Sequence, residues 1–199
     1  MSVKKVTATK LLVFTLCLTP FLLLIWKGFE NQLGANPVET ITHTTGDWAL
    51  YFLLLTLAIS PLRDLTGKSI LFRFRRMLGL YGFFYALLHF LTWLIFDHYF
   101  DWFEIQKDIF KRPYITVGFS AFVLLIPLTL TSTTGMRRRL GKHWNQLHQL
   151  IYVIAVLVIL HYLWLVKADT RDPIIFALIL IVLLLHRAWK QRITGINTK

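Results

Sequence analysis

The chain has 199 residues, of which 56% are hydrophobic and 16% charged, and its mean hydropathy is +0.58. Soluble domains are about 25% charged, so a water-soluble globule of this composition would expose much of its apolar surface. The single cysteine, Cys17, excludes a disulfide framework, a cysteine-based zinc site, an iron–sulfur cluster and c-type haem attachment. The net charge is +12, and most of the basic residues lie between long apolar runs rather than along one surface. This pattern favours a membrane protein over a nucleic-acid-binding one.

Six apolar segments are long enough to cross a hydrocarbon core about 30 Å thick. The first is not read as a signal peptide, because Pro20 interrupts it and no small-residue cleavage pattern follows. The second is the shortest, and no internal repeat or linker is evident. We therefore predict an all-α integral membrane bundle, one domain over residues 1–199, with six transmembrane helices over approximately residues 9–26, 48–62, 77–96, 114–131, 147–166 and 173–189.

The charges between these segments predict the orientation. With the N-terminus in the cytoplasm, 16 Lys and Arg residues lie inside and 6 outside, while nine of the ten acidic residues lie outside. We expect both termini in the cytoplasm. The acidic outer segment 97–108 is a candidate surface for a basic partner, and the basic inner face a candidate for anionic lipid or a soluble carrier. The alternative is that both are ordinary charges flanking the membrane.

Histidines are the notable ionisable residues within the predicted spans, which contain no Asp or Glu. His89 lies 13 residues after Arg76, and His161 lies 14 after Leu147, so both reach about 20 Å from the basic side at 1.5 Å per residue. Paired imidazoles on opposed helices are typical ligands of b-type haem. The alternative is that each histidine bonds a carbonyl or hydroxyl of a neighbouring helix.

Two glycines, Gly79 and Gly82, thin the third span below His89. They leave room for a flat cofactor or simply allow close helix packing. The remaining histidines fall in predicted loops or at interfaces, where a solvated role is the expectation: His43, His98, His143 and His186.

His148 lies 13 residues before His161 on the same span, but an ideal helix separates two such side chains by about 140°. A second haem there requires a bend and a partner other than histidine. Arg75 would be an unusual iron ligand because guanidinium stays protonated. Arg75 or Arg76 is instead a candidate partner for a haem propionate or a flavin phosphate.

Several short motifs occur together between about residues 33 and 166. They are Gly34-Ala-Asn-Pro37, Ile41-Thr-His43 with Thr45-Gly46, Arg75-Arg76-Met-Leu-Gly79-Leu, Arg112-Pro-Tyr114, Thr131-Ser-Thr-Thr-Gly135, Leu140-Gly-Lys-His143-Trp-Asn-Gln-Leu-His148 and His161-Tyr-Leu-Trp164. Together they resemble the MsrQ (YedZ) family of haem-binding membrane subunits, within the ferric-reductase-like transmembrane superfamily.

The resemblance implies a bacterial inner-membrane electron-transfer subunit. Such a subunit passes electrons from the respiratory quinone pool to MsrP, a periplasmic molybdopterin methionine-sulfoxide reductase with which it forms a heterodimer. The family's haem ligands map onto His89, His148 and His161, and FMN has been associated with the family. No residues of a flavin or quinone site carry over.

The chain shows no G-x-G-x-x-G fingerprint, and its outer loops are small. Donor and acceptor are therefore expected to come to it, the donor being quinol or a cytoplasmic flavin reductase, and no substrate site of its own is evident. Two alternatives remain. A histidine-relay transporter or proton channel without haem would favour acidic residues or broken helices at mid-membrane. An assembly protein would have no cofactor.

Overall fold

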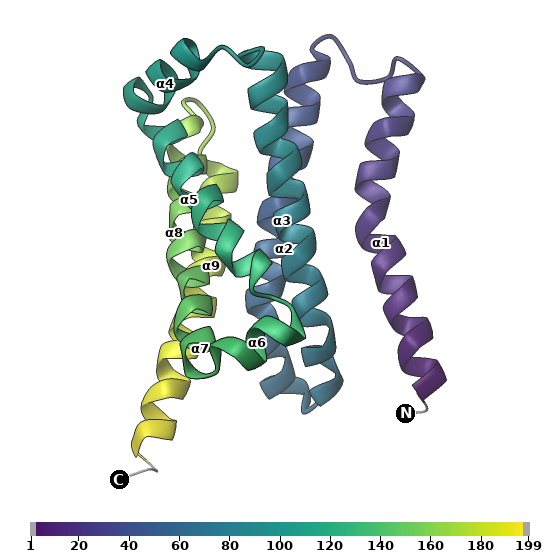
Figure 1. Cartoon of the computed structure of the whole chain (residues 1–199), viewed down its shortest axis with the longest axis vertical. Coiled ribbons are helices and arrows are strands. Elements are labelled where there is room, and N and C mark those ends of the chain that lie inside the picture. Colours follow the sequence, from purple (N-terminus) through teal and green to yellow (C-terminus); the bar gives the residue numbers. More distant parts are fainter. Residues whose placement is uncertain (1–2, 197–199) are drawn as a thin grey trace.

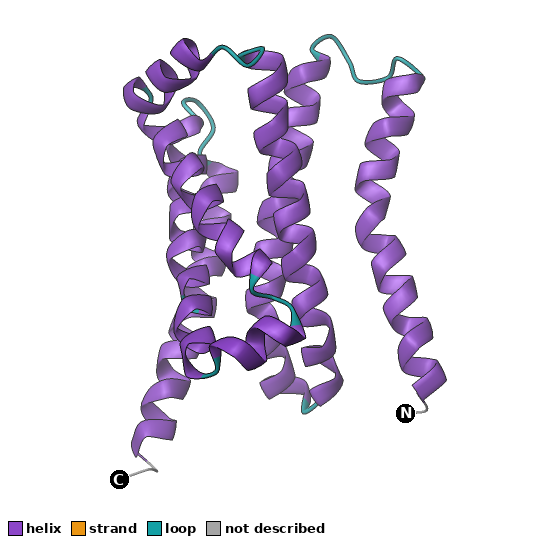
Figure 2. Ribbon diagram, in the orientation of Figure 1, coloured by secondary structure: helices purple, strands orange, loops and turns teal. Residues whose placement is uncertain are grey.

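The computed structural model describes the backbone of residues 3–196 and the side chains of residues 7–193. In that part of the chain every regular element is helical (Figure 2), which confirms the predicted all-α class. The elements are α1 (Val3–Phe29), α2 (Pro37–Thr66), a 3-10 turn η1 (Ser69–Leu71), α3 (Phe72–Thr92), a π-helical turn η2 (Trp93–Asp97), α4 (Trp102–Lys111), α5 (Pro113–Leu130), α6 (Thr134–Leu140), α7 (Lys142–His148), α8 (Leu150–Leu165) and α9 (Arg171–Ile196).

Six stretches of helix are long and apolar enough to cross a membrane, as predicted. They cover Thr7–Phe29, Pro37–Thr66, Ser69–Asp97, Pro113–Leu130, Lys142–Leu165 and Arg171–Ile193. Figure 1 shows both ends of the chain at the same end of the bundle, with α4 across the opposite end. The end that carries the termini is also the basic one, and its location in the cytoplasm remains a prediction.

The second span differs from the prediction, because α2 begins at Pro37 rather than near Trp48. The Asn36 side chain accepts a hydrogen bond of 3.3 Å from the Glu39 N–H and so caps the helix. Proline then occupies the first helical position, where its missing N–H costs nothing. Polar residues before Trp48 hid this helical start from a search for apolar runs.

The early start of α2 corrects two expectations about its residues. His43, expected in a loop or at an interface, lies in the helix, although its side chain is exposed. Asp47 is a carboxylate inside a span, where none was expected. The neighbouring threonines satisfy their hydroxyls internally: Thr42 donates to the Val38 carbonyl at 2.8 Å. The expected absence of acidic residues from the spans is therefore no longer an argument against the transporter alternative.

Four helices form two packed hairpins, α2 with α3 and α5 with α8. Aromatic stacking joins the first pair, because the Phe52 ring lies 5.5 Å from Tyr81 and 5.4 Å from Tyr85 between centroids. A Cβ at Gly79 would lie 3.7 Å from Thr56, and one at Gly82 would lie 3.7 Å from α2 atoms. These are ordinary contacts, so both glycines allow α2 and α3 to pack closely.

Helix α1 lies at the side of the bundle (Figure 1), and hydrogen bonds on either side of Pro20 join it to α3. A regular helix would pair the Phe21 N–H with the Cys17 carbonyl. The Tyr85 hydroxyl contacts both groups: it accepts from Phe21 N at 3.1 Å and donates to Cys17 O at 2.9 Å. Tyr81 donates a further bond of 2.8 Å to the Phe14 carbonyl, so two tyrosines hold α1 in place.

The predicted fifth span is interrupted at Gln149, between α7 and α8. The tight bonds Gln149 N–Gln146 O (3.2 Å) and Tyr152 N–Gln149 O (3.1 Å) join residues three apart, as in a 3-10 turn. The span thus contains a departure from ideal helix between His148 and the rest of α8.

Candidate functional site

A cavity of about 1010 Å³ lies between the two hairpins, and residues of α2, α3, η2, α4, α5 and α8 line it. His89 enters it from α3 and His161 from α8. Their ring centroids are 6.2 Å apart and the ring planes are inclined at 79°. The structure thus brings together the two histidines that the depth argument placed at one level.

Each of these imidazoles is held by a backbone carbonyl. His89 Nδ1 lies 2.9 Å from the Thr42 carbonyl oxygen, and His161 Nδ1 lies 2.7 Å from that of Tyr114. Because a carbonyl only accepts hydrogen bonds, each Nδ1 must carry the hydrogen and donate it. The Nε2 of each neutral ring therefore keeps its lone pair. Metal-binding histidines are oriented in this way, with the other ring nitrogen donating to a carbonyl or carboxylate.

Each of the two hairpins holds its histidine with the same arrangement of a carbonyl and a glycine. Both hydrogen bonds join residues separated by 47 positions, and one helical turn after each carbonyl stands a glycine. A Cβ at Gly46 would lie 3.1 Å from the His89 ring, and one at Gly118 would lie 2.6 Å from His161 Nδ1. No internal repeat was expected. The equal carbonyl–glycine–histidine spacing is the sequence signal that could have revealed both glycines.

The site suits a metal that brings its own equatorial ligands. Imidazole nitrogens bind metals at about 2.0–2.1 Å, so the 6.2 Å between the ring centroids of His89 and His161 would leave space for one metal that both rings could share. The described residues contain no group of three or more His, Cys, Asp or Glu that could hold a bare metal ion. A porphyrin supplies four nitrogens and needs only two axial ligands, so the residues present fit a haem.

A buried polar cluster closes the end of the cavity that lies beside α4. His98 Nε2 lies 3.1 Å from Asp108 Oδ2, and their side chains are only 8% and 10% exposed. Arg112 Nε lies 3.2 Å from Asp108 Oδ1, and the Trp93 ring edge packs on His98 with centroids 4.6 Å apart. The expectation that His98 is solvated is therefore wrong, because α4 covers it.

Among the arginines in the described part of the chain, Arg112 alone lines this cavity. Its hydrogen bond of 3.5 Å to the Tyr114 hydroxyl, together with the Asp108 carboxylate, raises the pKa of the guanidinium above its ordinary value. Arg112 therefore stays charged at the lining of the cavity, where it pairs with Asp108. In the sequence, Arg112 stood out only as part of the motif Arg112-Pro-Tyr114.

His148 has different surroundings and does not line the cavity. The Thr131 hydroxyl donates its only hydrogen to the Pro127 carbonyl, at 2.6 Å. The same hydroxyl oxygen lies 3.1 Å from His148 Nε2. His148 Nε2 must then donate to Thr131, and its lone pair is not available there. The ring stacks on Trp144 at 3.9 Å. His148 therefore has the hydrogen-bonded role that was the alternative to metal binding.

The other candidates also lie away from the cavity. Arg75 and His186 line a separate pocket of about 200 Å³ near the basic end of the bundle. Arg76 is exposed on α3, and His143 is exposed on α7. The structure does not bring Arg75 or Arg76 into the space that His89 and His161 share.

Comparison with known proteins gives consistent matches. Residues 45–159 match the family described as ferric reductase like transmembrane component. The chain is 58% identical over 194 residues to the protein-methionine-sulfoxide reductase heme-binding subunit MsrQ of Herminiimonas arsenicoxydans, covering 94% of this chain and 89% of the relative. It is 53% identical over 192 residues to that of Xanthomonas euvesicatoria pv. vesicatoria, covering 94% and 88%. No solved structure matches.

Proposed function

Because this chain belongs to the ferric-reductase-like transmembrane family and to the MsrQ haem-binding subunits within it, we propose that it is a b-type haem electron-transfer subunit of the bacterial inner membrane. A single membrane domain over residues 1–199 passes electrons from the respiratory quinone pool to a periplasmic molybdopterin methionine-sulfoxide reductase of the MsrP type. This transfer supports repair of oxidised periplasmic proteins.

The observation that carries the proposal is the matched pair of imidazoles. His89 and His161 each donate Nδ1–H to a carbonyl, which leaves two Nε2 lone pairs in one cavity with ring centroids 6.2 Å apart. We propose that these two residues would hold the iron of one haem through Nε2. The hydrogen bonds of His148 and its place outside the cavity favour a structural role, so a second haem is not part of the proposal.

When bound, the haem supplies a one-electron iron couple. The chain's own residues hold and insulate it. Both carbonyl bonds fix the ring orientation and raise the basicity of Nε2. Phe90 stacks on Phe122 with centroids 4.6 Å apart and contacts Phe119, so this part of the wall is aromatic and excludes water. Arg112, rather than Arg75 or Arg76, is the candidate partner for a haem propionate.

Partner assignments rest on chemistry and resemblance. The outer end carries Asp97, Asp101 and Glu104 at or near its surface, which suits a basic surface on the catalytic partner, while Asp108 is buried against His98 and Arg112. The donor is proposed to be quinol, with a cytoplasmic flavin reductase as the other candidate. FMN is proposed from the resemblance alone, and no residues are assigned to it.

Haem quantification on purified protein tests the assignment. We expect one b-type haem per chain by pyridine haemochrome and a six-coordinate low-spin spectrum. His89→Ala and His161→Ala should each abolish that spectrum, while the matched variant His148→Ala should keep it. A folded, colourless preparation would overturn haem binding and favour the transporter or assembly alternatives. A full low-spin spectrum in both ligand variants would overturn the pair.

The direction of electron flow needs a separate experiment. Protein reduced by quinol in proteoliposomes should be reoxidised when an MsrP-type reductase and methionine sulfoxide are added together. Omitting either component is the control. Failure of quinol to reduce the haem, with reduction by a flavin reductase, would replace the proposed donor but keep the haem assignment.

A further inference from the structure

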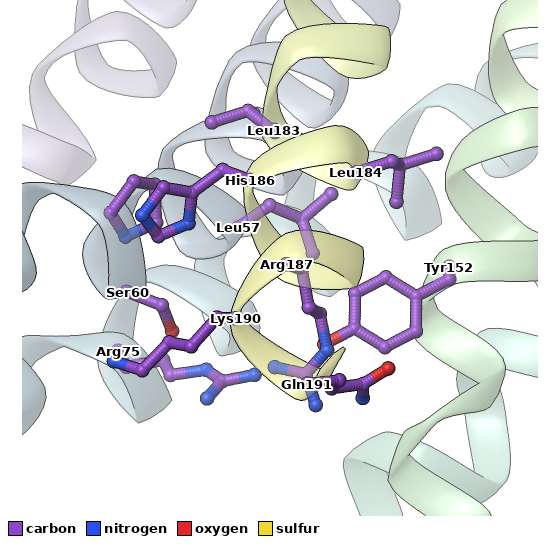
Figure 3. Close-up of a pocket in the computed structure, with 11 residues that line it drawn as sticks. Leu57, Ser60, Arg75, Tyr152, Leu183, Leu184, His186, Arg187, Lys190 and Gln191 are labelled. Carbon is purple, nitrogen blue, oxygen red and sulfur yellow. The ribbon is translucent and has the colours of Figure 1, made fainter. Parts of the chain in front are cut away.

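A second pocket, of about 200 Å³, lies between α2, α3, α8 and α9 near the basic end of the bundle (Figure 3). Its apolar part includes Leu57, Leu183 and Leu184. Its polar part includes Arg75 from α3 and Arg187 from α9, and Figure 3 shows both side chains reaching toward the same region. The pocket is therefore amphipathic, with cationic groups beside an apolar wall.

The Arg187 side chain is fixed by an aromatic ring, but one of its nitrogens lacks a hydrogen-bond partner among the described residues. Its guanidinium carbon lies 4.7 Å from the centroid of the Tyr152 ring, a cation–π contact that fixes the side chain. Its Nε is buried and has no hydrogen-bond partner among the described residues. Buried donors in native proteins nearly always have an acceptor, so an unpaired one needs an explanation.

The nearby carboxylate does not neutralise these arginines. Asp64 accepts from Arg63 at 2.6 Å and also pairs with Lys190. Among the described residues, no carboxylate lies within ion-pair distance of Arg75 or Arg187. Two guanidinium groups directed into one small, partly apolar space repel each other unless an anion joins them. Guanidinium geometry favours phosphate and carboxylate groups, which accept paired hydrogen bonds.

We propose that this pocket binds the phosphate group of an anionic phospholipid. The leucines place apolar surface next to the cationic groups, and the pocket lies toward one end of membrane-spanning helices, where headgroups are located. Basic pockets between transmembrane helices bind such headgroups. A soluble phosphate compound offers the same chemistry, so the experiment must separate the two sources. This inference is independent of the haem assignment.

Native mass spectrometry of the holoprotein from nanodiscs tests the proposal. We expect phosphatidylglycerol to remain bound in preference to phosphatidylcholine. Arg75→Gln and Arg187→Gln should each reduce its retention about fivefold, the loss expected for one cationic contact. Arg73→Gln on α3 and Arg192→Gln on α9 remove the same charge from exposed positions and serve as matched controls. Equal loss in variants and controls would overturn the site.

Thermal unfolding of the holoprotein in neutral detergent, with added inorganic phosphate or phosphatidylglycerol, separates the sources. Stabilisation by phosphatidylglycerol alone, lost in Arg187→Gln, supports the lipid assignment. Equal stabilisation by millimolar inorganic phosphate would overturn the lipid assignment in favour of a soluble phosphate compound. Should Arg187→Gln not fold, Arg187→Lys keeps the charge without the guanidinium fork and should still bind less lipid than wild type. Wild-type retention in Arg187→Lys would overturn the pairing geometry.

Discussion

Gly118 lies directly against the imidazole of His161, and a Cβ at that position would be 2.6 Å from Nδ1. That distance is shorter than any ordinary carbon–nitrogen contact, and the ring cannot move away without losing its 2.7 Å bond to the Tyr114 carbonyl. We predict that Gly118→Ala destabilises the protein by about 1–3 kcal/mol through overpacking. It should also weaken haem binding about 10–100-fold. Haem per chain and the Soret spectrum measure this effect.

Two other glycine variants serve as comparisons for the effect of Gly118→Ala on haem binding. A Cβ at Gly46 would lie 3.1 Å from the His89 ring, so Gly46→Ala should have a smaller effect of the same kind. A Cβ at Gly79 would meet Thr56 at 3.7 Å, an ordinary contact, so Gly79→Ala should leave the spectrum unchanged. Equal haem loss in all three would show that helix packing, rather than ring position, controls binding.

Tyr85→Phe should loosen α1. The Tyr85 hydroxyl bonds both Phe21 N and Cys17 O, so its removal takes away two hydrogen bonds between α3 and α1. We expect a loss of about 1–3 kcal/mol, with faster hydrogen exchange around Pro20. Tyr81→Phe removes one bond to a carbonyl and should cost about 0.5–1.5 kcal/mol. Equal rates of amide hydrogen exchange in α1 of the two variants would contradict a special role for the Tyr85 hydroxyl.

Asp108→Asn should open the end of the cavity that lies beside α4. Asp108 contacts both His98 and Arg112, and its side chain is 10% exposed. Losing these charge-assisted contacts should cost about 1.5–3 kcal/mol and increase hydrogen exchange in α4. The control is Glu104→Gln on the same helix, whose exposed pair with Lys107 should contribute about 0–1 kcal/mol. Unchanged exchange in Asp108→Asn would contradict a closing role for this cluster.

Thr131→Val tests the role given to His148. The substitution removes the acceptor of the 3.1 Å bond from His148 Nε2 and should cost about 1–3 kcal/mol in unfolding free energy. Because His148 lies outside the cavity, haem content and spectrum should stay as in wild type. A spectral change would mean that His148 contacts a cofactor after all.

Much of the architecture follows from local sequence. Long apolar runs predicted six spans, because backbone groups in a bilayer must be paired within the protein and an apolar run of this length pairs its own as a helix. The rise per residue then placed His89 and His161 at one depth. The start of α2 escaped the same reasoning, since its first turns are polar: Asn36 caps the helix and Pro37 opens it, and neither contributes an apolar signal.

The local sequence by itself determined the membrane class, the number of spans and the depth of the two histidines, because those depend on hydropathy and helical rise. Only the tertiary structure decided which way each imidazole faces, since a carbonyl on a neighbouring helix selects the tautomer of His89, His161 and, through Thr131, His148. It also assigned Arg75 and Arg112 to different pockets. Such partners are distant in sequence, and only the packing of the two hairpins brings them together.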